Sequence, residues 1–150
     1  MIKVGINGFG RIGRLALRII MEKYADQLEV TAINTSGKMD AQGWAHIFEF
    51  DTMFRRFPGS VESDDKNMIV NGKTIAILAE KEPDKIPWGH YGVETVIEST
   101  GAFTDEESLR KHLRDGVKRV ILSAPGKGGN VPTVVLGIND QEGQGKDILN

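Results

Sequence analysis

The sequence contains no cysteine among its 150 residues. This absence excludes disulfide bonds, thiolate metal sites and a cysteine nucleophile within the chain. The three histidines, His46, His90 and His112, lie far apart, and no two of them have the i, i+3 or i+4 spacing of helix-borne metal ligands. We therefore predict no metal site.

Long apolar runs and an excess of one charge are also missing. No apolar run approaches the ~20 residues that cross a bilayer, and the first residues continue directly into a strand-like run instead of a leader peptide. The 19 basic and 21 acidic residues give a net charge of −2, which does not favour nucleic acid or membrane surfaces as partners. We expect one cytoplasmic domain with neither partner.

The most informative segment is the N-terminus. The apolar run 2–7 leads into Gly8-Phe9-Gly10-Arg11-Ile12-Gly13, and apolar residues then recur at helical spacing up to Ile20. A Gly-x-Gly-x-x-Gly motif between a strand and a helix is typical of a dinucleotide-binding turn. Gly8 would allow the tight bend, Gly10 would let a pyrophosphate approach the backbone, and Gly13 would let the helix pack against the sheet.

The same helix carries Arg11, Arg14 and Arg18 on the side opposite its apolar stripe. Charged residues on such a side usually face solvent, so we predict exposed arginines. A contact with another domain or subunit is the alternative.

The remaining chain alternates between strand and helix patterns. Strands are predicted over 28–33, 93–99, 117–124 and 133–137, and helices over 39–50 and from a Thr104–Glu107 capping box to a stop at Gly116. Asn71-Gly72 between two apolar runs predicts a β-hairpin. The alternation predicts an α/β, Rossmann-type doubly wound fold, with a mostly parallel sheet and a small antiparallel hairpin.

The end of the second predicted strand bears on the choice of cofactor. NAD-binding domains usually carry Asp or Glu here, which binds the ribose hydroxyls. This chain has Asn34-Thr35-Ser36 instead, followed by Lys38. A carboxylate would repel a 2′-phosphate, whereas hydroxyls and a lysine would not, so the sequence favours NADP or both cofactors. Alternatively, Thr35 and Ser36 only cap the next helix.

Five segments, taken together, resemble the family of phosphorylating glyceraldehyde-3-phosphate dehydrogenases. They occur in the family's order and are more specific than the glycine motif alone. These segments are Asn7–Arg14, Glu80–Pro83 with Ile86–Trp88, Val93–Phe103, Val120–Pro125 and Val135–Asn139.

The resemblance implies a set of cofactor-binding residues. Asn7, Gly8, Phe9, Gly10, Arg11 and Ile12 would follow the pyrophosphate, Asn34, Thr35 and Ser36 would flank the adenosine ribose, Lys81 would lie near the adenine, and Ser99, Thr100, Gly101, Phe103 and Ser123 would line the nicotinamide half. For Ser99, Thr100 and Ser123, capping of strand ends is the alternative.

The resemblance also implies what this chain does not contain. In the family the nucleophilic cysteine and the catalytic histidine follow the position of Asn150, so residues 1–150 correspond to an NAD(P)-binding domain without its catalytic domain. The parent enzyme would be a homotetramer that oxidises glyceraldehyde 3-phosphate, and this chain would be inactive alone and would self-associate. A stand-alone dinucleotide-binding module and a fragment of an erythrose-4-phosphate dehydrogenase remain alternatives.

Overall fold

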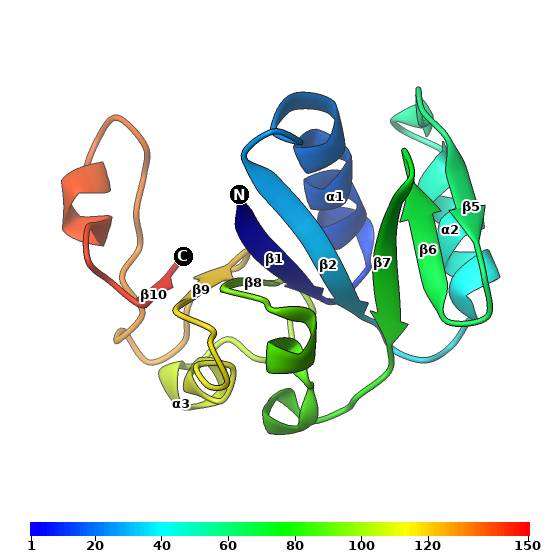
Figure 1. Cartoon of the computed structure of the whole chain (residues 1–150). Coiled ribbons are helices and arrows are strands. Elements are labelled where there is room, and N and C mark those ends of the chain that lie inside the picture. Colours follow the sequence, from blue (N-terminus) through cyan, green and yellow to red (C-terminus); the bar gives the residue numbers. More distant parts are fainter.

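The computed structural model describes residues 1–150 (Figure 1). Its strands are β1 (Ile2–Asn7), β2 (Leu28–Asn34), β3 (Phe50–Asp51), β4 (Arg55–Arg56), β5 (Val61–Ser63), β6 (Asn67–Val70), β7 (Lys73–Leu78), β8 (Thr95–Glu98), β9 (Arg119–Leu122) and β10 (Ile148–Leu149). Its α-helices are α1 (Arg11–Lys23), α2 (Ala41–Glu49) and α3 (Glu106–Arg110), and 3-10 turns cover Pro83–Lys85, Trp88–Tyr91 and Asp140–Gly143.

One large sheet organises the chain. Its strand order is β10-β9-β8-β1-β2-β7-β6-β5, and β3 pairs separately with β4. All pairings from β10 to β7 are parallel, and the two at the β7-β6-β5 edge are antiparallel. Asn71 and Gly72 form the β6–β7 turn with φ of 50° and 76°, as a tight hairpin requires. The predicted fold class and its edge hairpin are confirmed.

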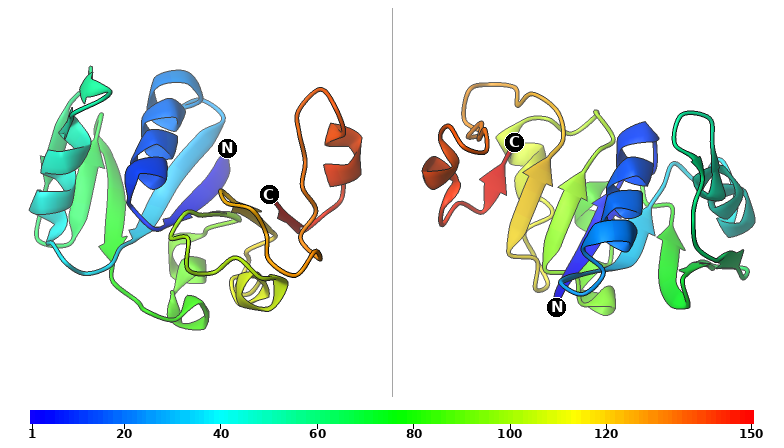
Figure 2. Two further views of the ribbon diagram at one scale, coloured as in Figure 1. Left: turned by 180° about the vertical axis from the view of Figure 1, so that it is seen from behind. Right: turned by 90° about the horizontal axis from the view of Figure 1, so that it is seen from above.

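Apolar residues cover both faces of the sheet. One core cluster joins β1 and β2 to α1 and α2, and a second joins the opposite face to α3 and the 3-10 turn Trp88–Tyr91. Figure 2 shows α1 and α2 on the same side of the sheet, away from α3. None of the helices combines the length and apolarity needed to cross a membrane.

Gly5, in the middle of β1, is explained by the tryptophan that packs on it. A Cβ at Gly5 would lie 2.6 Å from the ring of Trp88, which is fully buried. The missing side chain therefore lets an indole lie directly on the central strand.

The prediction that Arg18 faces solvent is wrong. Arg18 is 7% exposed, and its guanidinium donates to the carbonyl oxygen of Arg55 at 3.0 Å. It also lies 5.8 Å from the ring centroid of Phe48 and 5.3 Å from that of Phe57. The arginine holds the segment around β3 and β4 against α1, a long-range contact that helical periodicity does not reveal.

The strand predicted over 133–137 is absent. The Asn139 side chain accepts from the Val135 amide at 2.7 Å, and the Asn139 amide donates to the Val135 carbonyl at 3.1 Å, which closes a turn through Gly137 at φ 79°. β10 instead takes the position beside β9. An apolar run favours a strand, but here the local asparagine bonds compete with sheet pairing.

The predicted capping box is displaced by one residue. Asp105, not Thr104, caps α3, and its carboxylate accepts from the Ser108 amide at 2.9 Å. The helix ends at Arg110, well before the predicted stop at Gly116. A free carboxylate accepts a hydrogen bond more strongly than a hydroxyl does, so Asp105 takes the cap.

Candidate functional site

The glycine turn between β1 and α1 forms the floor of the site. A Cβ at Gly8, whose φ is 96°, would lie 2.7 Å from the Thr100 amide nitrogen, and one at Gly13 would lie 2.1 Å from the Gly8 carbonyl oxygen. At Gly10 a Cβ would meet nothing within 4 Å. Gly8 and Gly13 are thus required by backbone packing, whereas Gly10 leaves open space.

The N-terminus of α1 opens onto this space. Gly10 is its N-cap, no side chain caps it, and no acidic residue lies in its first turn. The first amides of a helix have no partner within the helix, and the helix dipole makes this end attractive to anions. The turn therefore presents the geometry that binds a phosphate group.

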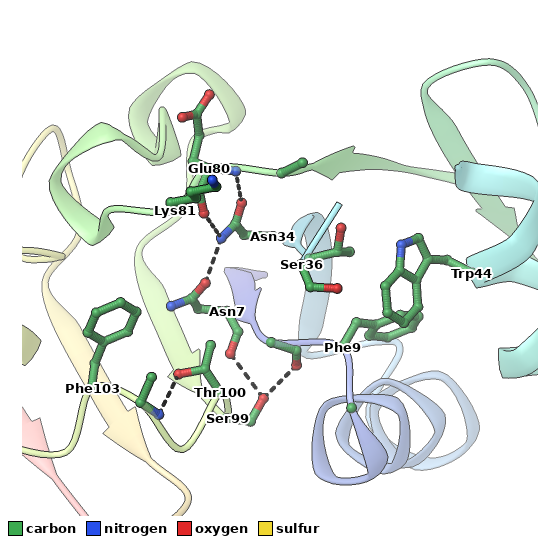
Figure 3. A pocket seen from close by; sticks show the side chains of 15 residues that line it. Asn7, Phe9, Asn34, Ser36, Trp44, Glu80, Lys81, Ser99, Thr100 and Phe103 are labelled. Atoms are coloured by element: carbon green, nitrogen blue, oxygen red, sulfur yellow. Dashed lines mark hydrogen bonds between the residues drawn. The ribbon is translucent and has the colours of Figure 1, made fainter. Parts of the chain in front are cut away.

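A pocket of about 480 Å³ lies at the carboxyl ends of β1, β2, β7 and β8 (Figure 3). Its volume is within the roughly 300–1,000 Å³ of small-molecule sites. β1 leads to β2 on one side, and β8 pairs on its other side, so the pocket lies where the strand order reverses. Ligands of open α/β sheets bind at such positions.

The pocket brings together most of the residues proposed from the sequence. Those that line it are Asn7, Gly8, Phe9, Gly10, Asn34, Thr35, Ser36, Lys81, Ser99, Thr100 and Phe103. Figure 3 shows Phe103 and Trp44 on opposite sides, with Asn7 and Asn34 between them.

Four proposed residues lie outside the pocket lining. Arg11 and Ile12 form the first turn of α1 beside Gly10. Gly101 makes a bend at φ 74° between two lining residues. Ser123 is exposed after β9, and its amide donates to the Glu98 carbonyl at 3.0 Å.

Four lining residues are not among those proposed from the sequence: Trp44, Ala79, Glu80 and Ala102. The sequence assigns Trp44 only to a helix. Its ring packs edge-on against Phe9 at 5.9 Å between centroids, and its indole nitrogen has no hydrogen-bond partner. Glu80 follows β7, and the carboxyl ends of neighbouring parallel strands meet at one edge, which is the signal that could have identified it.

The Thr35 hydroxyl is occupied within the chain. It donates to the Leu78 carbonyl oxygen at 2.9 Å and accepts from the Gly37 amide at 3.2 Å, and Thr35 is only 5% exposed. Its single proton is therefore not free for a ligand. Ser36 and Lys81 are exposed at the same end of the pocket, and the Glu80 carboxylate extends away from Asn34 (Figure 3).

The serine and threonine after β8 are also bonded internally. The Ser99 hydroxyl lies 2.7 Å from the Gly8 carbonyl oxygen, to which it donates. The Thr100 hydroxyl donates to Glu98 and accepts from the Ala102 amide at 3.1 Å. Both side chains thus fix the strand end and the glycine turn while their residues line the pocket.

The hydroxyls of Thr35, Ser99 and Thr100 are all held within the chain. Those of Thr35 and Ser99 donate to main-chain carbonyl oxygens, and that of Thr100 donates to the Glu98 carboxylate. The arrangement can hold and orient a ligand.

Comparison with known proteins agrees with this geometry. Residues 2–106 match the family model described as glyceraldehyde 3-phosphate dehydrogenase, NAD binding domain. Curated relatives named glyceraldehyde-3-phosphate dehydrogenase include a Thermotoga maritima protein, 46% identical over 95% of this chain and 42% of its own length, and a Clostridium pasteurianum protein, 45% identical over 99% and 43%. A Gracilaria gracilis relative described as cytosolic is 47% identical over 93% and 40%.

The chain spans about two fifths of the length of these relatives. The region shared with the Clostridium pasteurianum relative includes the glycine turn, the pocket and the parallel part of the sheet up to β9. The chain belongs to the family of glyceraldehyde 3-phosphate dehydrogenase NAD-binding domains.

Proposed function

We propose that the pocket binds a nicotinamide adenine dinucleotide in an extended conformation. The observation that carries this proposal is the position of the pocket, which opens on the uncapped N-terminus of α1 at Gly10. The pyrophosphate would lie over Gly10 and accept hydrogen bonds from the amides of Arg11 and Ile12. No metal is needed for this recognition.

The two halves of the dinucleotide would lie on either side of this turn. The adenosine would occupy the end formed by Asn34, Ser36 and Lys81, and the nicotinamide the end formed by Thr100 and Phe103. The family resemblance sets this direction, and Ser123, exposed directly after β9, would face the nicotinamide end.

We further propose that the site accepts NADP at least as well as NAD. The strand-end position that usually carries a ribose-binding carboxylate is Thr35, and the nearby charged groups include Lys81. Because the Thr35 hydroxyl donates to Leu78, the contacts to a 2′-phosphate would come from Ser36 and Lys81.

Calorimetric titration of the 150-residue chain with each dinucleotide tests both proposals. We expect weak binding of both, with NADP no weaker than NAD. If neither dinucleotide binds, the binding proposal is contradicted. A preference for NAD above about tenfold, which is about 1.4 kcal/mol, contradicts the NADP proposal alone.

For the whole protein we propose the reaction named in its relatives, the oxidation of glyceraldehyde 3-phosphate. Additional chain would supply the cysteine that this sequence lacks, whose thiolate would add to the aldehyde carbon. A nicotinamide cofactor bound in the pocket would supply the hydride acceptor. Cytoplasmic location and assembly as a homotetramer are parts of the same proposal. We expect the 150-residue chain alone to give background rates with triose phosphate, phosphate and either cofactor.

A further inference from the structure

A buried chain of hydrogen bonds runs beneath the pocket. It links Trp88, His112, Glu98, Asn7 and Asn34, in that order. Glu98 and His112 are fully buried, and Asn7 and Asn34 are 1% and 4% exposed. Buried polar groups are costly unless each is paired, so a chain of this length requires an explanation.

The bonds on the Trp88 side have a fixed direction. The indole nitrogen of Trp88 can only donate, and it lies 3.1 Å from Nδ1 of His112. Nδ1 is therefore the acceptor, so the proton of the neutral ring is on Nε2. Nε2 lies 3.3 Å from Oε2 of Glu98 and donates to it.

The bonds on the Asn34 side run toward Glu98 from the other end. The Glu80 amide donates to Oδ1 of Asn34 at 2.8 Å, and Nδ2 of Asn34 donates to Oδ1 of Asn7 at 2.8 Å. Nδ2 of Asn7 then donates to Oε2 of Glu98. The second proton of Asn34 Nδ2 goes to the Glu80 carbonyl at 2.9 Å, so one side chain holds both main-chain groups of Glu80 (Figure 3).

Glu98 is the point where all these donors meet. Oε2 accepts from Asn7 and His112, and Oε1 accepts from the amide and the hydroxyl of Thr100. An ionised carboxylate is an acceptor only, with room for about four donors. Thr100 lines one wall of the pocket and Glu80 another, so a single carboxylate ties the two walls together.

We propose that Glu98 is a positioning residue whose acceptor-only carboxylate sets the direction of this network and so preforms the dinucleotide pocket. The inference rests on the proposed function and extends it. Glu98 does not line the pocket, so it acts through Thr100 and through Asn7 and Asn34.

Reversing one bond shows why the carboxylate is required. The side-chain NH2 of a glutamine at position 98 would face either Asn7 and His112 or the Thr100 amide. The Thr100 amide can only donate, so the second orientation leaves it without an acceptor. The first orientation opposes the donors of Asn7 and His112.

Asn7 could rotate its side-chain amide so that its oxygen accepts from the glutamine, but its Nδ2 would then face Nδ2 of Asn34. If Asn34 rotated as well, its Nδ2 would face the N–H group of Glu80. The Glu80 amide and the Trp88 indole cannot become acceptors, so rotating the side chains between them cannot remove the pair of opposed N–H donors.

Calorimetry and amide exchange on four variants of the 150-residue chain test this inference. Glu98→Gln should weaken binding of NAD and NADP by about tenfold or more, which is about 1.4 kcal/mol. In the ligand-free chain it should speed hydrogen exchange of the Glu80 and Thr100 amides by a similar factor. The matched control is Glu94→Gln, the same change at a carboxylate paired with Lys118 near the other end of the strand, which should leave both readouts within about twofold.

A compensating change separates network direction from general damage. In the double variant Asn7→Asp with Glu98→Gln, the carboxylate introduced at position 7 supplies the acceptor one link along the chain, for donors from Asn34 and from the new glutamine. We expect this double variant to recover the slow exchange at Glu80 and part of the lost affinity, because the glutamine N–H still opposes the Nε2–H group of His112. Asn7→Asp alone places two carboxylates together and should impair both readouts.

Each outcome has a defined meaning. Wild-type exchange at Glu80 and Thr100 in Glu98→Gln overturns the inference, and so does a double variant that behaves no better than the single one. If Glu98→Gln does not fold, the folded double variant supports the inference and an unfolded one overturns it. If the wild-type chain binds no dinucleotide, the proposed function fails, while the exchange data of the ligand-free variants still decide the role of Glu98.

Discussion

Replacing Gly10 by aspartate should separate stability from binding. Gly10 has φ −74° and ψ −158°, a conformation open to any residue, and its Cβ would meet nothing within 4 Å. Aspartate is a better N-cap than glycine by a few tenths of a kcal/mol, and a carboxylate at this helix end adds roughly 0.3–1 kcal/mol. Because α1 has neither a side-chain cap nor an acidic first turn, we expect the Tm to rise by about 1–5 °C.

The same carboxylate should weaken dinucleotide binding. It would lie where we place the pyrophosphate, and one pair of like charges about 4 Å apart near a protein surface costs roughly 4 kcal/mol. Halving this value for screening by salt leaves about 2 kcal/mol, or a loss of roughly 30-fold in affinity.

Differential scanning calorimetry and titration calorimetry on Gly10→Asp measure the two effects. The control is Gln27→Glu, which adds the same charge at an exposed position just before β2, at the opposite edge of the sheet from Gly10. It should change neither the Tm nor the affinity. Unchanged affinity in Gly10→Asp would refute the assignment of the pyrophosphate to this turn. A lowered Tm would refute the claim that the approach of the ligand, and not the fold, requires a glycine at position 10.

Three further predictions concern cofactor choice, acid stability and association. Thr35→Asp should shift the preference toward NAD by about tenfold in paired titrations, because a carboxylate accepts from ribose hydroxyls and repels a 2′-phosphate; an unchanged ratio would place the ribose elsewhere. The Ser108 amide and hydroxyl lower the pKa of Asp105 from 3.8, so the carboxylate stabilises the fold fully above that value and loses this effect as the pH falls through the lower folded pKa. Urea melts from about pH 7 to about pH 2 should show a fall in the free energy of unfolding, which Asp105→Asn should reduce. Leu136 and Ile138 are 87% and 80% exposed, so sedimentation should show a mean mass that rises with concentration and falls when both become serine; equal masses would show that this loop does not drive association.

Local pattern is sufficient to predict the parallel sheet, the glycine turn and the hairpin. The glycine turn and the hairpin depend on residues close in sequence, Gly8 to Gly13 and Asn71-Gly72, whose backbone requirements are visible in the residue types themselves. The parallel sheet is predicted from the alternation of strand and helix patterns. Ser99 and Lys81 are assigned to the pocket by the family resemblance, because the spacing of the glycine motif alone does not point to them.

The rest depends on contacts between distant segments. Arg18 is buried by a hairpin more than thirty residues away, as the Arg55 bond shows, and Ile148–Leu149 takes the sheet position that the run 133–137 does not fill. Glu98 does leave a signal, a charged residue at the end of the half-buried strand Thr95–Glu98. Its partners are 14 and 91 residues away in the sequence, so their identity required the structure.

The lengths of the outer strands bear on how any association proceeds. The sheet ends in β10, two residues long, on one side and in β5, three residues long, on the other. Such short edges offer another chain few free backbone groups, and acidic Glu62, Asp64 and Asp65 accompany the β5 edge. Contacts between copies should therefore be made by side chains without strand addition. The infrared amide I band should keep its monomer shape as the mean mass grows, and the fluorescence of fibril-binding dyes should not increase.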